Sequence, residues 1–355
     1  MNLATSEIEE SPLPSSGSLD AAAPALRVVA IGGGSGLSTL LHGLREHVSS
    51  TGPNARPGLI SDLAAVVTVT DDGGSSGRLR KHFNMLPPGD LRNCMVALCE
   101  DEDLLAQLFN HRFRAGDSLK GHNFGNLFVA ALTEITGDFA HAIQLTSKIL
   151  ATRGRIYPVT TANATLVARM RDGSLVRGET NITASQLHIE ELMLDPPDAA
   201  PLPETLEAIE RADLITVGPG SLYTSLITNL LVQGMPAALA NARGVRVYIC
   251  NLMSEANESL ELTASEHIER IYEHAHAPIF DYALVNTAPF SAETLARYAA
   301  ENASPITADI ERIEALGVRC IAGDFAGEEG YVRHATGRVT EALLALGQAG
   351  PVNRV

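Results

Sequence analysis

The chain has 355 residues, enough for one large α/β domain or two smaller ones. Hydrophobic residues make up 45% of it and charged residues 19%, which is typical of a protein with a sizeable core. The formal net charge of -16 argues against a nucleic-acid partner, because contacts to a phosphate backbone need clustered Lys and Arg, but it leaves room for a small anionic ligand.

The cysteines and the N-terminal sequence bear on the cellular compartment. The four cysteines are scattered and lack the spacing of metal ligands, so we expect buried free thiols in a reducing cytoplasm. The N-terminus is acidic and rich in Ser and Pro, without the basic start and apolar stretch of a secretory signal. No apolar run approaches membrane-spanning length. We therefore expect a cytoplasmic protein without membrane insertion.

The first predicted elements are a polar tail and a strand–loop–helix unit. Residues 1–24 lack periodicity and are predicted to be disordered, with a single α/β domain over 25–355. Arg27–Ile31 is a short apolar strand that runs into Gly32-Gly33-Gly34-Ser35-Gly36, and leucines spaced for one helical face follow. The glycine spacing fits neither the dinucleotide fingerprint nor a Walker A loop. Glycines at a helix start still favour a phosphate or nucleotide, and the predicted contacts are Gly33, Gly34, Ser35 and Gly36.

The second predicted strand, Ala64–Thr70, ends in the run Asp71-Asp72-Gly73-Gly74-Ser75-Ser76-Gly77-Arg78-Leu79-Arg80. Small residues let the backbone approach a phosphate closely, and arginines can neutralise it. The predicted ligand contacts here are Asp72, Gly73, Gly74, Ser75, Ser76 and Arg78. Asp71 and Asp72 could also hold Mg2+, which proteins bind through one or two carboxylates. The alternatives are a hydrogen bond to a ribose hydroxyl and a strand-end Asx turn.

Two helix-entry segments follow. In Pro87-Pro88-Gly89-Asp90, a turn precedes an apolar helix, and Asp90 is a good N-cap for it, while Asn93 has no evident structural role. In Gly121-His122-Asn123-Phe124-Gly125-Asn126, hydrogen-bonding side chains surround glycines ahead of a helix. His122 is a candidate general acid or base, a phosphate donor or a structural histidine. Asp90, Asn93, His122, Asn123 and Asn126 join the predicted ligand contacts.

The rest of the chain alternates strands and helices, with one interruption. A hairpin signal at Asp172-Gly173 predicts an antiparallel excursion near 151–200. Mainly apolar strands are predicted at Leu214–Val217, Val245–Cys250, Ala283–Val285 and Val318–Ala322. Buried strands that alternate with helices indicate an α/β fold whose mainly parallel sheet is covered on both faces.

After the strand Leu214–Val217 comes a second glycine loop, Gly218-Pro219-Gly220-Ser221-Leu222-Tyr223-Thr224-Ser225. Its glycines and hydroxyls suit phosphate oxygens at a helix start, so Gly218, Gly220, Ser221 and Thr224 are predicted contacts; Ser221 as a helix N-cap is the alternative. There is no G-x-S-x-G nucleophile elbow, which argues against a hydrolase. Because several such loops follow the carboxyl ends of strands, we expect them to meet at one cleft.

These motifs, taken in order, resemble the gluconeogenesis factor family (YvcK-like), within the wider CofD-like group that includes 2-phospho-L-lactate transferase. The resemblance runs from about Arg27 to the C-terminus. It implies a Rossmann-like three-layer sandwich, a cytoplasmic location and binding of a UDP-sugar such as UDP-N-acetylglucosamine. It also implies a role in cell shape and cell-wall synthesis during growth on gluconeogenic carbon sources. Tyr298 and Arg333 match family positions that imply UDP-sugar contacts, and Asn251 opens a further family segment.

One departure from the family pattern concerns that segment. After Asn251-Leu252-Met253 the family usually continues Thr-Gln-Pro-Gly-Glu-Thr, whereas this chain has Ser254-Glu255-Ala256-Asn257-Glu258-Ser259. The change removes Pro and Gly and adds a negative charge at Glu255, so ligand identity or affinity is expected to differ here.

Two functions stay open at this point. The favoured one is a nucleotide-sugar-binding regulatory factor, with a cell-wall synthesis protein as its partner and a homo-oligomeric state. The alternative is a Mg2+-dependent phosphotransferase related to 2-phospho-L-lactate transferase. An NAD-dependent oxidoreductase is disfavoured because the fingerprint spacing fails.

Overall fold

A computed structural model describes residues 24–50, 57–100, 104–185, 187–255, 258–328 and 331–351. The predicted tail over 1–24 therefore lies outside the described residues except for its last position. Among the described residues, no helix combines the length and the apolar composition needed to cross a bilayer.

The centre of the molecule is a seven-stranded sheet in which every neighbouring pair is parallel. Its strands, from one edge to the other, are β10 (Arg319–Gly323), β9 (Tyr282–Asn286), β8 (Val245–Ile249), β7 (Leu214–Val217), β1 (Leu26–Gly32), β2 (Ile60–Val67) and β3 (Arg155–Pro158). The central strands β1, β7 and β8 are almost entirely buried, which explains their continuous apolar sequences.

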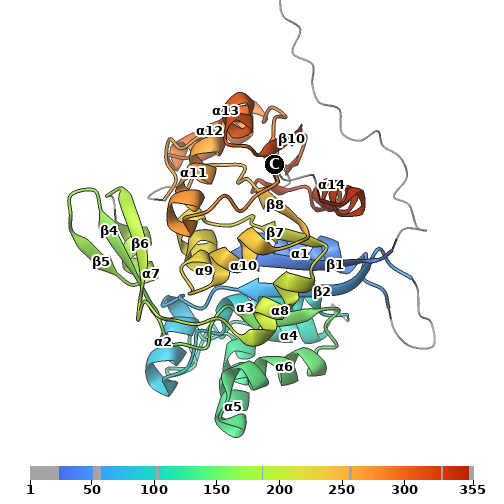
Figure 1. Ribbon diagram of the computed structural model, residues 1–355. Coiled ribbons are helices and arrows are strands. Elements are labelled where there is room, and N and C mark those ends of the chain that lie inside the picture. The colour runs from blue at the N-terminus through green and yellow to red at the C-terminus, as the bar shows by residue number, and fades with distance from the viewer. Residues whose placement is uncertain are drawn as a thin grey trace, which may run out of the picture.

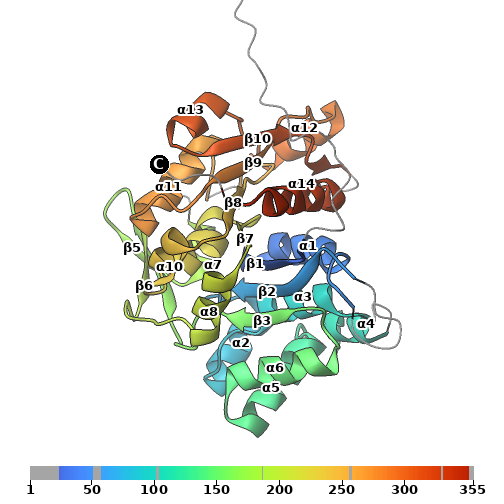
Figure 2. The same cartoon turned by 45° about the vertical axis from the view of Figure 1, so that its right-hand side comes forward.

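Helices cover both faces of this sheet, as Figures 1 and 2 show. On one face, α1 (Gly34–Arg45) packs against α14 (Thr336–Ala349) and α3 (Gly89–Leu98). Beyond them lie α2 (Gly74–Phe83), α4 (Leu104–Asn110), α5 (Phe124–Thr136) and α6 (Phe139–Ile149). The other face carries α8 (Pro203–Arg211), the short π-type helix η1 (Leu222–Ile227), α9 (Thr228–Leu230), α10 (Met235–Asn241), α11 (Ala264–Ala275) and α13 (Ile310–Ala315). The predicted α/β, Rossmann-like three-layer sandwich is confirmed.

An antiparallel unit interrupts the parallel pattern, as predicted, and stands out from the body in Figure 1. It consists of β4 (Thr165–Met170), β5 (Leu175–Arg177) and β6 (Ile189–Asp195), with α7 (Glu179–Ala184) between the last two. Gly173 has φ +84° in the turn between β4 and β5, a conformation that favours glycine. The segment Arg155–Pro158, which the sequence analysis grouped with this excursion, instead forms the edge strand β3 of the main sheet. Its four residues are too few for periodicity to separate it from the hairpin.

The order of the parallel strands fixes where a ligand can bind. From β1 the chain moves to β2 and β3 on one side, whereas β7 lies on the other side of β1 and leads to β8, β9 and β10. Connections that leave neighbouring strands in opposite directions open a crevice at the carboxyl ends of those strands. The crevice here lies between β1 and β7, and these are the strands that precede the two glycine loops.

Candidate functional site: a cavity at the carboxyl ends of β1 and β7

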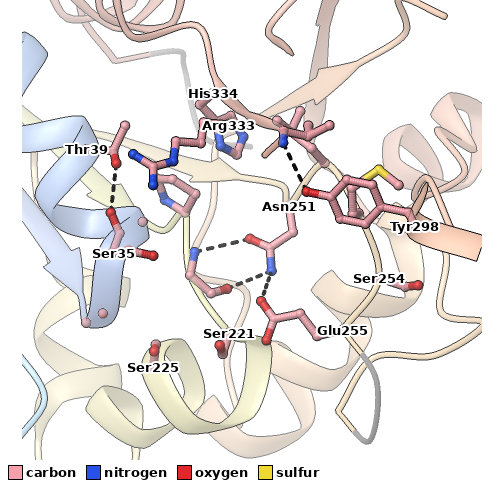
Figure 3. Close-up of a pocket in the computed structure, with 18 residues that line it drawn as sticks. Ser35, Thr39, Ser221, Ser225, Asn251, Ser254, Glu255, Tyr298, Arg333 and His334 are labelled. Carbon is pink, nitrogen blue, oxygen red and sulfur yellow. Dashed lines mark hydrogen bonds between the residues drawn. The ribbon is translucent and has the colours of Figure 1, made fainter. Parts of the chain in front are cut away.

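A cavity of about 290 Å³ occupies this crevice. Figure 3 shows that its walls come from segments far apart in the chain. They are the start of α1, the loop after β7, the loop after β8, α12 (Ala292–Ala300) and β12 (Arg333–His334), which pairs with β11 (Ala326–Gly327). The lining residues are Gly33, Gly34, Ser35, Gly36, Thr39, Pro219, Gly220, Ser221, Ser225, Asn251, Leu252, Met253, Ser254, Glu255, Tyr298, Val332, Arg333 and His334.

The first glycine loop places the start of α1 against the cavity. Its first turn has no acidic residue and its N-cap residue, Gly33, has no side chain, so the N–H groups of Ser35 and Gly36 and the helix dipole are available to an anion. Gly34 has φ +63° and donates its N–H to the Asp90 carboxylate over 2.8 Å. A Cβ on Gly36 would lie 2.4 Å from the Pro219 carbonyl oxygen, so glycine at this position lets the two glycine loops touch.

The second glycine loop differs from the prediction, because its helix start is occupied by a carboxylate of the chain itself. Glu258 is buried and accepts hydrogen bonds from the backbone N–H of Tyr223, from that of Thr224 and from the Thr224 hydroxyl. Ser221 precedes η1 but makes no side-chain cap. Burial, reinforced by the neighbouring carboxylate of Glu255, raises the pKa of Glu258 to about 7. Phosphate contacts at Thr224 would have to displace this internal cap.

Asn251 connects the loop after β8 to the second glycine loop. Its Oδ1 accepts from the Gly220 N–H over 3.1 Å, and its Nδ2 donates to the Gly220 carbonyl over 2.8 Å. Ser254 is held by Ser304, whose backbone N–H donates to the Ser254 hydroxyl over 2.9 Å. The side chain of Asn251 lines the cavity, as predicted for a contact, and its hydrogen bonds show that it also positions the loop.

Three side chains from the last part of the chain complete the walls. The Tyr298 hydroxyl accepts from the Val332 N–H over 3.0 Å. Arg333 lines the cavity and, in Figure 3, its guanidinium points toward the start of α1. Within the described part of the chain, no carboxylate forms an ion pair with Arg333. His334 donates from Nε2 to the Cys250 carbonyl over 3.0 Å, and burial lowers its pKa to about 4, so its ring is neutral at pH 7.

The other predicted motifs form a separate polar cluster beside the cavity. We call it the acidic cluster; its members are Asp71, Ser75, Ser76, Asp90, His122 and Glu179. The Ser75 hydroxyl lies 3.1 Å from His122 Nδ1, and Thr70 donates to Glu179 over 3.2 Å. Burial, with Asp71 and Asp90 nearby, raises the pKa of Glu179 to about 9. Burial also raises the pKa of Asp90 to about 6 and lowers that of His122.

Asp90 links the acidic cluster to the cavity, and here the prediction of a helix N-cap is wrong. Asp90 lies inside α3, whose start has no side-chain cap, and its carboxylate reaches across to Gly34 instead. The run Gly74–Gly77 forms the first turn of α2. A Cβ on Gly77 would lie 1.8 Å from the Asp72 carbonyl oxygen, so this glycine serves packing.

Asp71 and Asp72 both have hydrogen-bond partners within the chain. Asp71 accepts from the Gly73 N–H over 2.8 Å, which is the predicted Asx turn. Asp72 accepts from the N–H and the hydroxyl of Thr180. Among the described residues, no group of three or more His, Cys, Asp or Glu side chains is arranged to hold a metal ion. A Mg2+ ion at these residues stays a prediction.

The predicted contacts therefore divide into two groups. Those that line the cavity are Gly33, Gly34, Ser35, Gly36, Gly220, Ser221, Asn251, Tyr298 and Arg333. Those outside it are Asp72, Gly73, Gly74, Ser75, Ser76, Arg78, Asp90, Asn93, His122, Asn123, Asn126, Gly218 and Thr224. Several of the second group have structural partners: Asn123 caps α5 by accepting from the Asn126 N–H, and Arg78 donates to the Lys120 carbonyl.

Sequence reasoning missed half of the lining residues. They are Thr39, Pro219, Ser225, Leu252, Met253, Ser254, Glu255, Val332 and His334. Thr39 follows the first glycine loop by one helical turn, which is the spacing that returns a side chain to the same helix face. The Leu252–Glu255 segment carried a signal, because it follows a predicted strand at the same sheet edge as the glycine loops.

Comparison with known proteins agrees with this geometry. The family model described as 2-phospho-L-lactate transferase CofD matches residues 28–326. A gluconeogenesis factor of Halalkalibacterium halodurans is 46% identical over 89% of this chain and 95% of its own length. The gluconeogenesis factor of Bacillus subtilis is 41% identical over 90% of this chain and 98% of its own.

Solved structures are similar as well. A crystal structure of a Bacillus halodurans protein has a TM-score of 0.85 and 45% identity and covers 90% of this chain and 100% of that one. A second one, titled as a member of the UPF0052 family, has a TM-score of 0.84 over 90% of this chain and 99% of its own. The glycine loops, the strand order and these relatives lead to one conclusion: the chain belongs to the gluconeogenesis factor family within the CofD-like group.

Proposed function

We propose that the cavity binds a nucleotide sugar, with UDP-N-acetylglucosamine as the first candidate, and that the protein acts as a regulatory factor through this binding. The observation that carries the proposal is the pairing of two features. One is the start of α1, where Gly33 supplies no side-chain cap and Asp90 accepts from the Gly34 N–H; the other is Arg333, a cation that forms no ion pair among the described residues. A helix N-terminus and a guanidinium are both suited to a diphosphate. The diphosphate would lie between Ser35, Gly36 and Arg333.

The remaining walls suit the uncharged parts of such a ligand. Tyr298 presents an aromatic ring to the cavity, and the guanidinium of Arg297 lies 5.6 Å from the centre of that ring, which helps to fix it. An aromatic face is suited to a base or a sugar ring. Met253 and Leu252 add apolar surface, while Ser254 and Glu255 add polar groups. Mixed walls of this kind are typical of small-molecule sites.

The biological role follows from the family resemblance and is proposed with it. The factor would act in the cytoplasm, support cell shape and cell-wall synthesis during growth on gluconeogenic carbon sources, and pass its ligand state to a cell-wall synthesis protein. A transferase reaction is the weaker alternative, since Asp71 and Asp72, which would share a Mg2+ ion, already accept hydrogen bonds from Gly73 and Thr180. Product analysis after incubation with the UDP-sugar and Mg2+ distinguishes turnover from binding.

Isothermal titration of UDP-N-acetylglucosamine into the wild type and Arg333→Ala tests the binding proposal. Charge-assisted hydrogen bonds contribute about 1.5–3 kcal/mol, so the substitution should weaken binding at least roughly tenfold. Arg211→Ala is the matched control, because Arg211 is an exposed arginine at the end of α8 that forms an ion pair with Glu207 on the surface. Equal affinities for the wild type and Arg333→Ala would refute the placement of the diphosphate.

A further inference from the structure

The cavity holds two opposite charges that do not neutralise each other. Arg333 comes from β12 and Glu255 from the loop after β8, and Figure 3 shows Asn251 between them. Neither side chain forms an ion pair within the described residues. Unpaired charges in a partly enclosed space are costly unless a ligand satisfies them. The pair therefore indicates a ligand with an anionic group at one end and hydrogen-bond donors at the other.

Glu255 has acceptor capacity that the protein does not use. An ionised carboxylate offers about four lone-pair positions. Its partners are the Ser221 hydroxyl and the Asn251 Nδ2, which lies at the long distance of 3.5 Å. Glu258, three residues later, has three donors at the start of η1 and does not line the cavity. The two carboxylates of this loop thus differ: one caps a helix and the other faces the cavity.

The surroundings of Glu255 limit the chemistry of its partner. Its backbone is held in place, because its own N–H donates to the Ser259 hydroxyl over 3.1 Å and the neighbouring Ser254 is hydrogen-bonded to Ser304. Burial raises its pKa, and a second anion beside it would raise the pKa further, so a phosphate does not belong at this end. Hydroxyl and amide N–H groups are the donors that a sugar moiety provides.

We propose that Glu255 is a specificity-determining residue: its carboxylate accepts hydrogen bonds from hydroxyl or amide donors on the sugar of the nucleotide sugar whose diphosphate lies at α1 and Arg333. The inference rests on the proposed function and extends it to the part of the ligand that is recognised. It also gives a role to the position at which the chain departs from the family pattern, where a neutral Gln is usual.

A ligand–variant cycle tests the proposal. UDP-N-acetylglucosamine and analogues that each lack one donor are titrated into the wild type, Glu255→Ala and Glu255→Gln at pH 8. In each analogue one sugar hydroxyl is replaced by fluorine, or the acetamide N–H by an ester oxygen, and neither replacement can donate. In the wild type, at least one replacement should weaken binding about tenfold, because it leaves the carboxylate unpaired. In Glu255→Ala the same replacement should change affinity less than twofold, and Glu255→Gln, which keeps one acceptor, should fall between them.

The control and the contrary results are equally specific. Glu301→Gln removes an exposed carboxylate at the end of α12 and should leave every affinity as in the wild type. If every analogue loses the same factor in the wild type and in Glu255→Ala, the inference is wrong, whatever the overall affinity. If the wild type does not bind UDP-N-acetylglucosamine at all, the proposed function fails instead. Should Glu255→Ala not fold, as judged by circular dichroism, the comparison of wild type with Glu255→Gln decides.

Discussion

The acidic cluster yields a stability prediction that needs no ligand. Glu179 begins α7 and its carboxyl group is buried close to Asp71 and Asp90, with one donor, the Thr70 hydroxyl at 3.2 Å. Burial first, and then the neighbouring carboxylates, raise its pKa from the ordinary value of 4.5 to about 9. In the unfolded chain the same group ionises near its ordinary value. Ionisation is therefore easier in the unfolded state.

The sign and the size of the effect follow from this difference. Below pH 4.5 the carboxyl group of Glu179 is neutral in the folded and the unfolded state, so it does not lower the free energy of unfolding. As the pH rises from 4.5 toward 9, the unfolded state loses its proton first, so the free energy of unfolding falls. Each unit of pKa difference corresponds to about 1.4 kcal/mol, so the loss by pH 8 is on the order of 5 kcal/mol. Glu179→Gln cannot ionise and keeps an acceptor for Thr70, so it should match the wild type at pH 4 and exceed it at pH 8.

Urea unfolding at several pH values measures this. The chain has no tryptophan, so the far-ultraviolet circular dichroism of its helices is the suitable signal. Glu210→Gln, at an exposed carboxylate on α8, is the control and should follow the wild type throughout. If the free energy of unfolding changes with pH in the same way for the wild type and Glu179→Gln between pH 4.5 and 9, the fold does not hold this carboxyl group neutral.

Two further predictions concern the first glycine loop. Gly36→Ala places a methyl group 2.4 Å from the Pro219 carbonyl oxygen, so it should force the two glycine loops apart and weaken UDP-N-acetylglucosamine binding at least about tenfold by titration. Gly337→Ala, in helix α14 with no atom within 4 Å of the new Cβ, gains the same helix propensity and should bind normally. Asp90→Ala removes the acceptor of the Gly34 N–H and should weaken binding more than Asp90→Asn, which keeps an acceptor. Equal loss in the two Asp90 variants would mean that charge, and not loop position, is what Asp90 contributes.

The fold was accessible from the sequence where patterns are local. Apolar strands followed by glycine and helical leucines identified β1 and α1. Short strands were harder to assign from the sequence. The strand β3 has four residues, too few for their pattern to distinguish it from the hairpin that follows. The boundaries of β2 also differ, since it ends at Val67 and not at Thr70.

The site could be predicted only in part, because a local sequence pattern does not show which distant residue will hydrogen-bond to it. A glycine loop before a helix predicts an anion site, yet Glu258 fills one such helix start from 34 residues away. An Asp after Pro-Gly predicts an N-cap, yet Asp90 bonds Gly34 across the molecule, 56 residues earlier. In both cases the side chain satisfies a backbone N–H, as the local rule requires, but on a different helix. No single-sequence rule selects the partner.

The position of Arg333 adds an argument about the family. The match to the CofD family model ends at residue 326, so the glycine loops, the acidic cluster and Glu255 lie within it. Arg333 and α14 lie after it, and α14 packs against α1. A Cβ on Gly43 of α1 would lie 2.2 Å from the Thr336 side chain, so this contact is close. The proposed anion site at α1 would thus combine a helix start from the family-wide segment with a cation from the segment that follows it. If the gluconeogenesis factor family differs from the 2-phospho-L-lactate transferases in its ligand, its selectivity for a diphosphate should depend on this C-terminal segment. Arg333→Lys keeps the positive charge but loses the planar guanidinium that can bind a phosphate through two N–H groups.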